Sequence, residues 1–419
     1  MNGLLRRLAA VLVLLSAFAS SATGGAAGYD IPVLMYHDIT DDPAALNTMR
    51  VTSERFRWDM EFLAQFGYTP LLPAELLAIR AGEKEMPEKP VMITFDDGYR
   101  SNYELAFPVL RETGMKAVVA VVCRNMLERG SGDPGRTALT WRELREMAAS
   151  GVFEIGSHTY DLHNPEYQGK AVPGGINGVM RRPGETESTY AARVGADLAA
   201  SIAMIRRKTG QQSVNYFSYP FGAAERWMQP LLQQEGIGVS TLTNEGAASI
   251  DRGLYDLPRY RVDMSRPLSV LLRQTATAEP SQTVVSSGGK TQVLPTYLID
   301  GSHYVRVRDV AALLDGTEVG FDVRWNATRQ CVELTSKTDY TTADAAAAPL
   351  PTGGRTVQSV VEPTVVDGTA RMVAAYKIDG STYYKLRSLG VLCGFAVDWD
   401  EQAHAVLLDT APQAAQVPA

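Results

Sequence analysis

The sequence predicts an α/β protein, a distorted (β/α)7-type barrel followed by a smaller α+β domain made of repeats. Two observations carry this prediction. Short β-rich runs alternate with helical patterns from residue 31 to about residue 267, and a later part of the chain repeats itself. Several of the runs are continuously apolar, as parallel strands buried on both faces are. A doubly wound sheet is the alternative arrangement for such an alternation.

Seven β-rich runs are expected to be the barrel strands. They are residues 31–36, 91–95, 116–122, 153–157, 215–219, 238–243 and 257–262. Between them, Thr140 and Glu143 form the signature of a capping box, which predicts a helix over residues 141–149. Residues 190–208 place Val194, Leu198, Ile202 and Ile205 on one face, which predicts a second amphipathic helix.

The second half of the chain changes in composition. Residues 268–292 are rich in Ser, Thr, Gln and Gly, and we predict a linker there. A repeat domain is expected over residues 293–410, and the last stretch, 411–419, is expected to be disordered.

The repeat domain contains two similar copies, expected over about residues 283–337 and 362–410. The matching segments are residues 297–314 with 376–393, and residues 321–325 with 395–399. Each copy is predicted to be strand, Asp-Gly turn, strand, helix and strand.

Composition excludes several functional classes. The chain has 419 residues, which allows two or three domains at roughly 150 residues each. Its 40 Lys and Arg against 47 Asp and Glu give a net charge of −7. We therefore expect no nucleic-acid partner, because phosphate binding needs a basic face. Three cysteines are too few for a disulfide framework or a paired-cysteine zinc site.

The amino-terminal 28 residues have the layout of a secretory signal peptide. Arg6 and Arg7 precede an apolar run over residues 8–19, and small residues follow it. A membrane span would need roughly 20 apolar residues, so this run is too short for one. A buried core helix is the alternative. We expect a protein that is secreted or associated with the cell surface or cell wall.

Titratable side chains follow the predicted strands. His37 follows the first strand, Asp96 and Asp97 the second, and His158 and His163 the fourth. Catalytic groups of a β/α barrel project from the carboxyl ends of its strands, so these residues should share one face.

Three of these residues form a candidate metal site. Asp97, His158 and His163 supply one carboxylate and two imidazoles, a donor set that leaves a position open at a catalytic metal. The five-residue spacing of the histidines does not fit one helix face, so a turn or loop must carry them. The alternative is that Asp97 caps a turn and the histidines belong to a polar loop.

Two motifs resemble a known family. Thr-Phe-Asp-Asp-Gly-Tyr at residues 94–99 resembles the first motif of the NodB-homology polysaccharide deacetylases, carbohydrate esterase family 4. Ser-His-Thr-Tyr-Asp-Leu-His at residues 157–163 resembles the second. The histidine spacing and Pro-Val-Leu-Met-Tyr-His at residues 32–37 are similar to the poly-N-acetylglucosamine deacetylase branch. The resemblance covers about residues 30–265, and we expect this domain to span residues 29–267.

The resemblance implies specific roles. One divalent metal, expected to be zinc with cobalt or nickel as alternatives, would be held by Asp97, His158 and His163. Asp96 would be the general base. The backbone N–H of Phe221, after the proline of the third motif, would stabilise the oxyanion.

Two tyrosines of the motifs, Tyr99 and Tyr219, together with Tyr160, are candidates for lining a sugar subsite. Each could equally be barrel packing, because aromatic rings serve both purposes.

The sequence departs from the family pattern in its third motif. Ser218 stands where the family has an arginine that orients the catalytic aspartate. Arg259 or Arg261 would take its place, or either is a structural charge.

The late Leu-His motif that supplies a general acid is absent as well. His37 is therefore the candidate acid in the barrel, its alternative being a hydrogen-bonded structural residue. His303 or His404 would have to reach over from the second domain.

The repeats resemble the copper amine oxidase N-terminal-like domain, and their single histidines indicate no copper chemistry. They are expected to be a structural spacer, with contact to cell-wall glycan as the alternative. The predicted function is a secreted, monomeric, metal-dependent N-deacetylase acting on N-acetylglucosamine residues of an exopolysaccharide or cell-wall glycan. The alternatives are an O-acetyl xylan esterase and a non-catalytic glycan-binding wall protein.

Overall fold

The computed structural model describes residues 30–128, 138–163, 166–167, 170–171, 178–266, 268–272, 275–287, 290–326, 331–341, 353–400 and 405–411. The predicted signal peptide lies outside these residues, as do residues 412–419 of the predicted tail. Within the described residues, no helix is long and apolar enough to cross a membrane.

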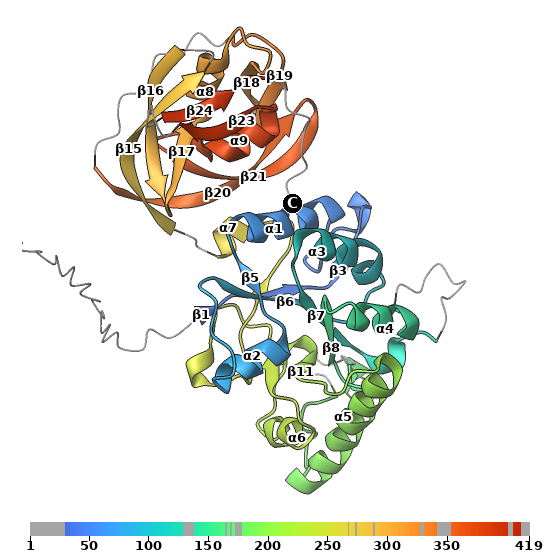
Figure 1. The fold of residues 1–419 in the computed structure, drawn as a ribbon. Helices are drawn as coiled ribbons and strands as arrows, with labels where there is room; N and C mark the ends of the chain where they lie inside the picture. Colours follow the sequence, from blue (N-terminus) through green and yellow to red (C-terminus); the bar gives the residue numbers. More distant parts are fainter. Residues whose placement is uncertain are drawn as a thin grey trace, which may run out of the picture.

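The amino-terminal half is built on a sheet of parallel strands, as predicted (Figure 1). In spatial order these are β12 (Val239–Thr241), β11 (Tyr216–Ser218), β8 (Phe153–Ser157), β7 (Ala117–Val121), β6 (Pro90–Phe95), β2 (Val33–Tyr36) and β14 (Tyr260–Arg261), with β5 (Thr69–Pro70) beside β6. Strands β2, β6, β7 and β8 are buried along their whole length, because helices or loops cover both faces.

A single bridge closes the sheet into a distorted barrel. Leu257 pairs with Thr241 of β12 in parallel, and its N–H donates to the carbonyl of Ser240 at 2.9 Å. Later in the same segment, Arg261 of β14 pairs with Met35 of β2. The segment leading into β14 therefore joins the first and last sides of the sheet, which confirms the distorted barrel.

Helices surround the sheet. They are α1 (Ser53–Gln65), α2 (Pro73–Arg80), α3 (Phe107–Thr113), α4 (Trp141–Ala149), α5 (Glu187–Thr209), α6 (Met228–Gln234) and α7 (Leu268–Leu271). The predicted capping box is present in α4, where Thr140 and Glu143 bond each other's backbone N–H. The predicted second helix is α5, which buries Val194, Leu198 and Ile202.

Short elements complete this half of the chain. They are β1 (Asp30–Ile31), β3 (Asp38–Ile39), β4 (Arg50–Val51), β9 (Glu166–Tyr167), β10 (Lys170–Ala171) and β13 (Ala248–Ser249), with single helical turns η1 (Pro43–Ala45), η3 (Cys123–Asn125), η4 (Pro220–Gly222) and η5 (Ile250–Arg252). The turn η2 (Asn102–Ala106) is a π-helix. It immediately precedes α3 and follows the loop that carries Asp96 and Asp97.

The second domain is a ten-stranded sheet with two helices. The first copy contains β15 (Thr275–Ser287), β16 (Lys290–Ile299), β17 (Ser302–Arg306), α8 (Val307–Leu314), β18 (Phe321–Asn326) and β19 (Cys331–Ser336). The second contains β20 (Arg355–Val366), β21 (Thr369–Ile378), β22 (Ser381–Lys385), α9 (Leu386–Cys393), β23 (Ala396–Asp400) and β24 (Ala405–Asp409). Both predicted Asp-Gly turns have positive φ at both residues, as tight hairpin turns require.

Strands of one copy pair with strands of the other. Strand β19 of the first copy pairs in parallel with β20 of the second, and β24 of the second pairs in parallel with β15 of the first. Strands β17 and β22, which are equivalent, pair antiparallel to each other. The copies therefore share one sheet and one core.

Residues 268–292 are not a linker, which corrects the prediction. They contain α7, all of β15 and the start of β16. The side chains of Thr283, Val285 and Ser287 are buried at alternate positions. Small polar residues fit here because β15 lies inside the sheet between β16 and β24, and β-branched residues favour strands.

The second domain packs on the outside of the barrel, next to α1 and α7 (Figure 1). The Phe66 ring lies 6.3 Å from the Tyr376 ring, and the Lys89 ammonium lies 3.9 Å from the Asp300 carboxylate. Phe66 follows the end of α1 and Lys89 precedes β6, so both contacts lie at the amino-terminal end of the strands. The carboxyl edge of the sheet, where catalytic groups are expected, stays clear of these contacts.

Candidate active site

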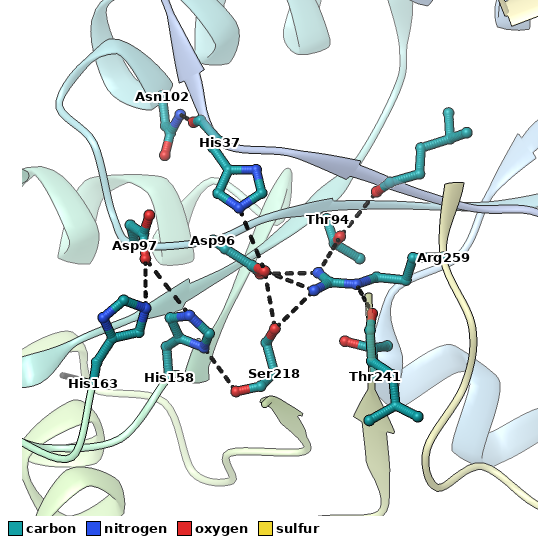
Figure 2. Close-up of polar contacts among 12 residues, drawn as sticks. His37, Thr94, Asp96, Asp97, Asn102, His158, His163, Ser218, Thr241 and Arg259 are labelled. Atoms are coloured by element: carbon teal, nitrogen blue, oxygen red, sulfur yellow. Dashed lines mark hydrogen bonds and ion pairs between the residues drawn. The ribbon is translucent and has the colours of Figure 1, made fainter. Parts of the chain in front are cut away.

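Three predicted metal ligands converge at the carboxyl edge of the sheet (Figure 2). Oδ1 of Asp97 lies 3.5 Å from Nε2 of His158 and 3.3 Å from Nε2 of His163. The ligand atoms of all three residues lie within 4.8 Å of one another. Asp97 follows β6, and both histidines follow β8, so strands far apart in sequence deliver the three groups to one point.

The protonation states of the three candidate ligands are suited to binding a cation. Nδ1 of His158 donates to the carbonyl of Ser218 at 2.7 Å, which leaves Nε2 as a lone pair facing Asp97. Burial lowers the pKa of His158 to about 3 and also lowers the pKa of His163, so both rings are neutral ligands at pH 7. Burial and the neighbouring Asp96 raise the pKa of Asp97 to about 7. A partly buried carboxylate without a counter-charge is costly, and a bound divalent ion would supply that charge.

Asp96 has a different set of partners. Nη1 of Arg259 donates to its Oδ1 at 2.9 Å and Nη2 to its Oδ2 at 2.7 Å. Oγ of Ser218 accepts from Nη2 of Arg259 and donates to Oδ2 of Asp96, each at 3.0 Å. Burial alone would raise the pKa of Asp96, but Arg259 outweighs it and holds that pKa well below its usual range. Asp96 is therefore a fully buried but ionised carboxylate.

Arg259 is fully buried and is held from several sides. Its Nε donates to the carbonyl of Leu242 at 2.7 Å, and Nη1 donates to Oγ1 of Thr94 at 3.1 Å. It comes from the segment just before β14, on the closing side of the barrel. Of the two arginines considered from the sequence, the structure brings Arg259 to Asp96, whereas Arg261 lies beside Asp263.

His37 faces Asp96 from the end of β2. Its Nε2 lies 4.0 Å from Oδ2 of Asp96, and its backbone carbonyl accepts from Nδ2 of Asn102 at 2.8 Å. Burial lowers the pKa of His37 to about 4, although the Asp96 carboxylate acts in the opposite direction. His37 is therefore neutral at pH 7 and lies close to the buried carboxylate.

Three non-glycine residues of the site have a left-handed backbone. They are Asp97 with φ of 73°, Thr159 with φ of 81° and Phe221 with φ of 58°. Such conformations cost about 1–3 kcal/mol each and persist where the surroundings impose them. At Asp97 the turn separates its carboxylate from that of Asp96, so that one faces the histidines and the other Arg259 (Figure 2). At Phe221 it brings the ring to 4.7 Å from His163.

Several supporting residues were not predicted from the sequence. Asp197 of α5 accepts the backbone N–H groups of Tyr160 and Asp161 at 2.8 and 2.9 Å, which fixes the loop between the two histidines. Ser101 donates to Asp38 at 2.7 Å and accepts the N–H of Ile39 at 3.1 Å. Together with Asn102 it joins the loop after β2 to the loop after β6. The sequence signal for this contact is the polar Ser-Asn pair that begins two residues after the first motif.

Other predicted residues lie differently. Tyr219 is 1% exposed and packs at a right angle to Phe217, so its ring does not line a sugar subsite as expected. Tyr99 is half-buried, and burial together with Asp97 raises the pKa of its hydroxyl to about 12. His303 lies in the second domain, 3.0 Å from Oγ1 of Thr283, and His404 is outside the described residues.

Comparison with known proteins agrees with this geometry. Residues 83–239 match the family profile Polysaccharide deacetylase. The chain is 32% identical over 232 residues to the putative polysaccharide deacetylase YxkH of Bacillus subtilis, covering 55% of this chain and 71% of that protein. The chain belongs to the polysaccharide deacetylase family. Members of this family are hydrolases, so the chain is an enzyme of the same class.

Other relatives of this deacetylase carry more specific names. The chain is 26% identical over 260 residues to the poly-beta-1,6-N-acetyl-D-glucosamine N-deacetylase of Escherichia coli, covering 59% of this chain but only 38% of that protein. It is 23% identical over 212 residues to the enzyme of the same name from Staphylococcus aureus, covering 51% of this chain and 67% of that protein.

A solved structure has the same fold as the deacetylase domain. A de-N-acetylase from Aggregatibacter actinomycetemcomitans superposes with a TM-score of 0.50 at 23% identity, covering 58% of this chain and 99% of the other.

Proposed function

We propose that this deacetylase is a metal-dependent N-deacetylase that hydrolyses the acetamide groups of N-acetylglucosamine residues in an exopolysaccharide or a cell-wall glycan. One observation carries the proposal: the carboxylates of the adjacent residues Asp96 and Asp97 lie in two different environments. One is held ionised by Arg259, and the other meets two neutral imidazoles. The names of the Escherichia coli and Staphylococcus aureus relatives support the choice of an N-acetylated polymer.

The metal would be held by Asp97, His158 and His163, with zinc expected and cobalt or nickel as substitutes. When bound, such an ion supplies Lewis-acid polarisation of the amide carbonyl and lowers the pKa of a bound water. The hydrogen bond from His158 to Ser218 orients one ligand, and the loop bonds from Asp197 hold the segment that carries both histidines.

Asp96 is the general base of the proposed reaction. It accepts a proton from the attacking water, while Arg259 and Ser218 keep its two oxygens fixed. The hydroxyl of that water adds to the acetyl carbon. The backbone N–H of Phe221, in the turn next to His163, would donate to the carbonyl oxygen as negative charge develops there.

His37 is the proposed general acid. When the C–N bond breaks, the leaving nitrogen needs one proton, which equals the proton that Asp96 removed from water. Nε2 of His37 lies 4.0 Å from Oδ2 of Asp96, longer than a hydrogen bond, so passage of the proton from the carboxyl group through the imidazole to the amine requires the two side chains to move closer when substrate binds. Water is thereby divided between acetate and the free amino sugar, and both residues return to their starting forms.

The remaining expectations concern the whole molecule. We infer that residues 1–28 direct export, that the protein acts as a monomer outside the cell or at its surface, and that the two repeats are a structural spacer, with contact to cell-wall glycan as the alternative. The layout of the first residues supports export.

Acetate release tests the proposal. The purified protein would be stripped with a chelator, reloaded with zinc or cobalt, and offered β-1,6-linked N-acetylglucosamine oligomers, chitin oligomers, peptidoglycan and acetylxylan. Metal-dependent release from an N-acetylated substrate is expected. Release from acetylxylan alone would favour an O-acetyl esterase. Bound metal without release from any substrate would favour a non-catalytic glycan-binding protein, and absence of metal binding would refute the ligand assignment.

A further inference from the structure

A cationic aromatic cluster lies near the candidate active site. The guanidinium carbon of Arg181 is 5.2 Å from the centre of the Trp227 ring, and that of Arg226 is 5.5 Å from it. Both arginines are exposed, and Trp227 is half-buried. Contacts of a cation with an aromatic face at this range are attractive. We call Arg181, Arg226 and Trp227 the Arg-Trp cluster.

The Arg-Trp cluster stands at the carboxyl edge of the sheet. Trp227 immediately precedes α6, and the same connection begins with η4, which carries Phe221. The Trp227 ring is 5.6 Å from that of Tyr190, near the start of α5. Asp197 of α5 bonds the loop of His158 and His163, and Tyr190 lies two turns earlier, about 10 Å along the helix. The Trp227 ring therefore contacts the same helix, α5, that bonds the metal loop.

The segment that carries Arg181 is held rigidly. Arg193 of α5 forms an ion pair with Glu185 at 2.7 Å and donates to the carbonyl of Met180 at 3.0 Å. The hydroxyl of Tyr190 donates to the carbonyl of Val179 at 2.9 Å. This segment begins at Gly178, whose N–H donates to the carbonyl of Leu162, next to His163. Arg181 is thus fixed relative to the site.

Charge at the Arg-Trp cluster is not balanced. Glu185 is engaged by Arg193, whereas the described residues form no ion pair with Arg181 or Arg226. Glu225 is the neighbouring acid, and its carboxylate accepts the backbone N–H of Arg226 at 3.0 Å. Arg182 adds another exposed cation beside Arg181. A local positive charge therefore persists in a chain whose net charge is −7.

We propose that the Arg-Trp cluster is a subsite for a carboxylate-bearing sugar that neighbours the reacting N-acetylglucosamine in the chain. The proposal rests on the proposed function. Guanidinium groups bind carboxylates with paired hydrogen bonds, and an indole edge offers an apolar surface to the sugar ring. The reacting sugar itself is neutral, so the anion must be on an adjacent unit. A chain that already carries free amines would be repelled.

The test compares three tetrasaccharides of equal length. One is an N-acetylhexosamine tetrasaccharide with lactyl carboxylates on alternate sugars, one is the same molecule with these carboxylates reduced to alcohols, and one is a chitin tetramer. For the zinc-loaded protein at low salt, we expect KM to be at least about tenfold lower for the first than for the second, as hydrogen bonds to a charged group imply. The difference should shrink in about 0.5 M salt.

The variant Arg181→Gln/Arg226→Gln should bring the two KM values together. The matched control is Arg206→Gln/Arg207→Gln, which removes the same charge from exposed positions at the other end of α5 and should keep the tenfold difference. Equal KM values in the unaltered protein, or a difference that survives in the first variant, would overturn the subsite.

Failure of the proposed function would look different, because no tetrasaccharide would release acetate. Calorimetric binding of the carboxylate and reduced tetrasaccharides then still decides the proposal. Tighter binding of the carboxylate form that depends on Arg181 and Arg226 supports it, and equal affinity refutes it.

Discussion

Arg259 forms a paired hydrogen bond with Asp96, 2.9 Å at Nη1 and 2.7 Å at Nη2, although 163 residues separate them in the chain. Ser218 completes the arrangement by bonding both partners. Arg259, from the segment before β14, therefore orients Asp96. The third-motif position at which the family has an arginine is Ser218 in this chain. Both side chains are buried, so the geometry of the pair determines the orientation of the proposed base.

Arg259→Lys should lower kcat by about tenfold to a hundredfold, because an ammonium group keeps the charge but not the two parallel bonds. Arg259→Met should also destabilise the protein by about 3–5 kcal/mol, since it leaves Asp96 buried without a counter-charge. Acetate release and thermal unfolding would be measured for both variants. Full activity in Arg259→Lys would show that charge alone is sufficient.

Replacement of Asp96 and replacement of Asp97 should have different effects on metal binding. Asp96→Asn is expected to abolish turnover while one equivalent of zinc remains bound, whereas Asp97→Asn should lose both the metal and the activity. Elemental analysis after dialysis, together with acetate release, distinguishes the two. Loss of zinc from the Asp96→Asn variant would contradict the division of roles between these residues.

Chelation provides a related test of the whole cluster. Zinc added back to the stripped protein should restore activity and raise the melting temperature, because the ion binds the folded state and supplies a counter-charge to the half-buried Asp97 carboxylate. His163→Ala should abolish both effects. A melting temperature that does not respond to zinc in the unaltered protein would argue against a metal at this place.

Asn102 is predicted to act through His37. Asn102→Ala should lower kcat by roughly tenfold, since the bond to the His37 carbonyl fixes the loop after β2. His37→Gln should lower it further, because the leaving amine then lacks a proton donor. In a double-mutant cycle, Asn102→Ala should have little added effect in the His37→Gln background. Additive losses would show that Asn102 supports something else, and full activity of His37→Gln would refute the acid role.

Gly222 should be intolerant of a side chain. A Cβ there would clash with Oγ1 of Thr243 and lie 2.9 Å from its backbone nitrogen, so Gly222→Ala should displace the turn that carries Phe221 and lower kcat by about a hundredfold. Gly210→Ala is the matched control. It has the same left-handed backbone but no atom within 4 Å, so it should cost about 1 kcal/mol of stability and leave kcat unchanged. Similar kinetics for both variants would contradict this reasoning.

The contact between the domains is expected to contribute to stability. Tyr376→Ala should destabilise the protein by about 3 kcal/mol, because it removes a buried ring that packs against Phe66 and Tyr304. Trp399→Ala, at an exposed ring of the same domain, should change stability by less than about 1 kcal/mol. Chemical unfolding followed by tryptophan fluorescence and circular dichroism would compare them. Equal effects would indicate that the domains are not coupled through this contact.

Much of the site could be predicted because strand ends are readable in the sequence. The buried runs before His37, Asp96 and His158 are clear, and parallel strands bring their carboxyl ends together. Which arginine reaches Asp96 was not readable, since Arg259 and Arg261 are alternate residues of one segment and their side chains point differently.

Other features have no local signal. Tertiary contacts impose the left-handed backbone at Asp97, Thr159 and Phe221, and the residue types at these positions are not sufficient to predict it. The burial of Tyr219 depends on the ring of Phe217 beside it. Residues 268–292 have the composition of a linker because the buried positions of β15 include Thr283 and Ser287, so no alternation of apolar and polar residues marks the strand.

The pairing of β19 with β20, and of β24 with β15, determines whether one copy of the repeat could fold without the other. A gene fragment encoding one copy would leave β15 without β24 and β19 without β20, with open sheet edges that invite aggregation. A single copy would need a second identical chain to supply the missing strands. The two copies therefore form one folding unit, and deletion of either half would remove pairing partners from the strands of the other.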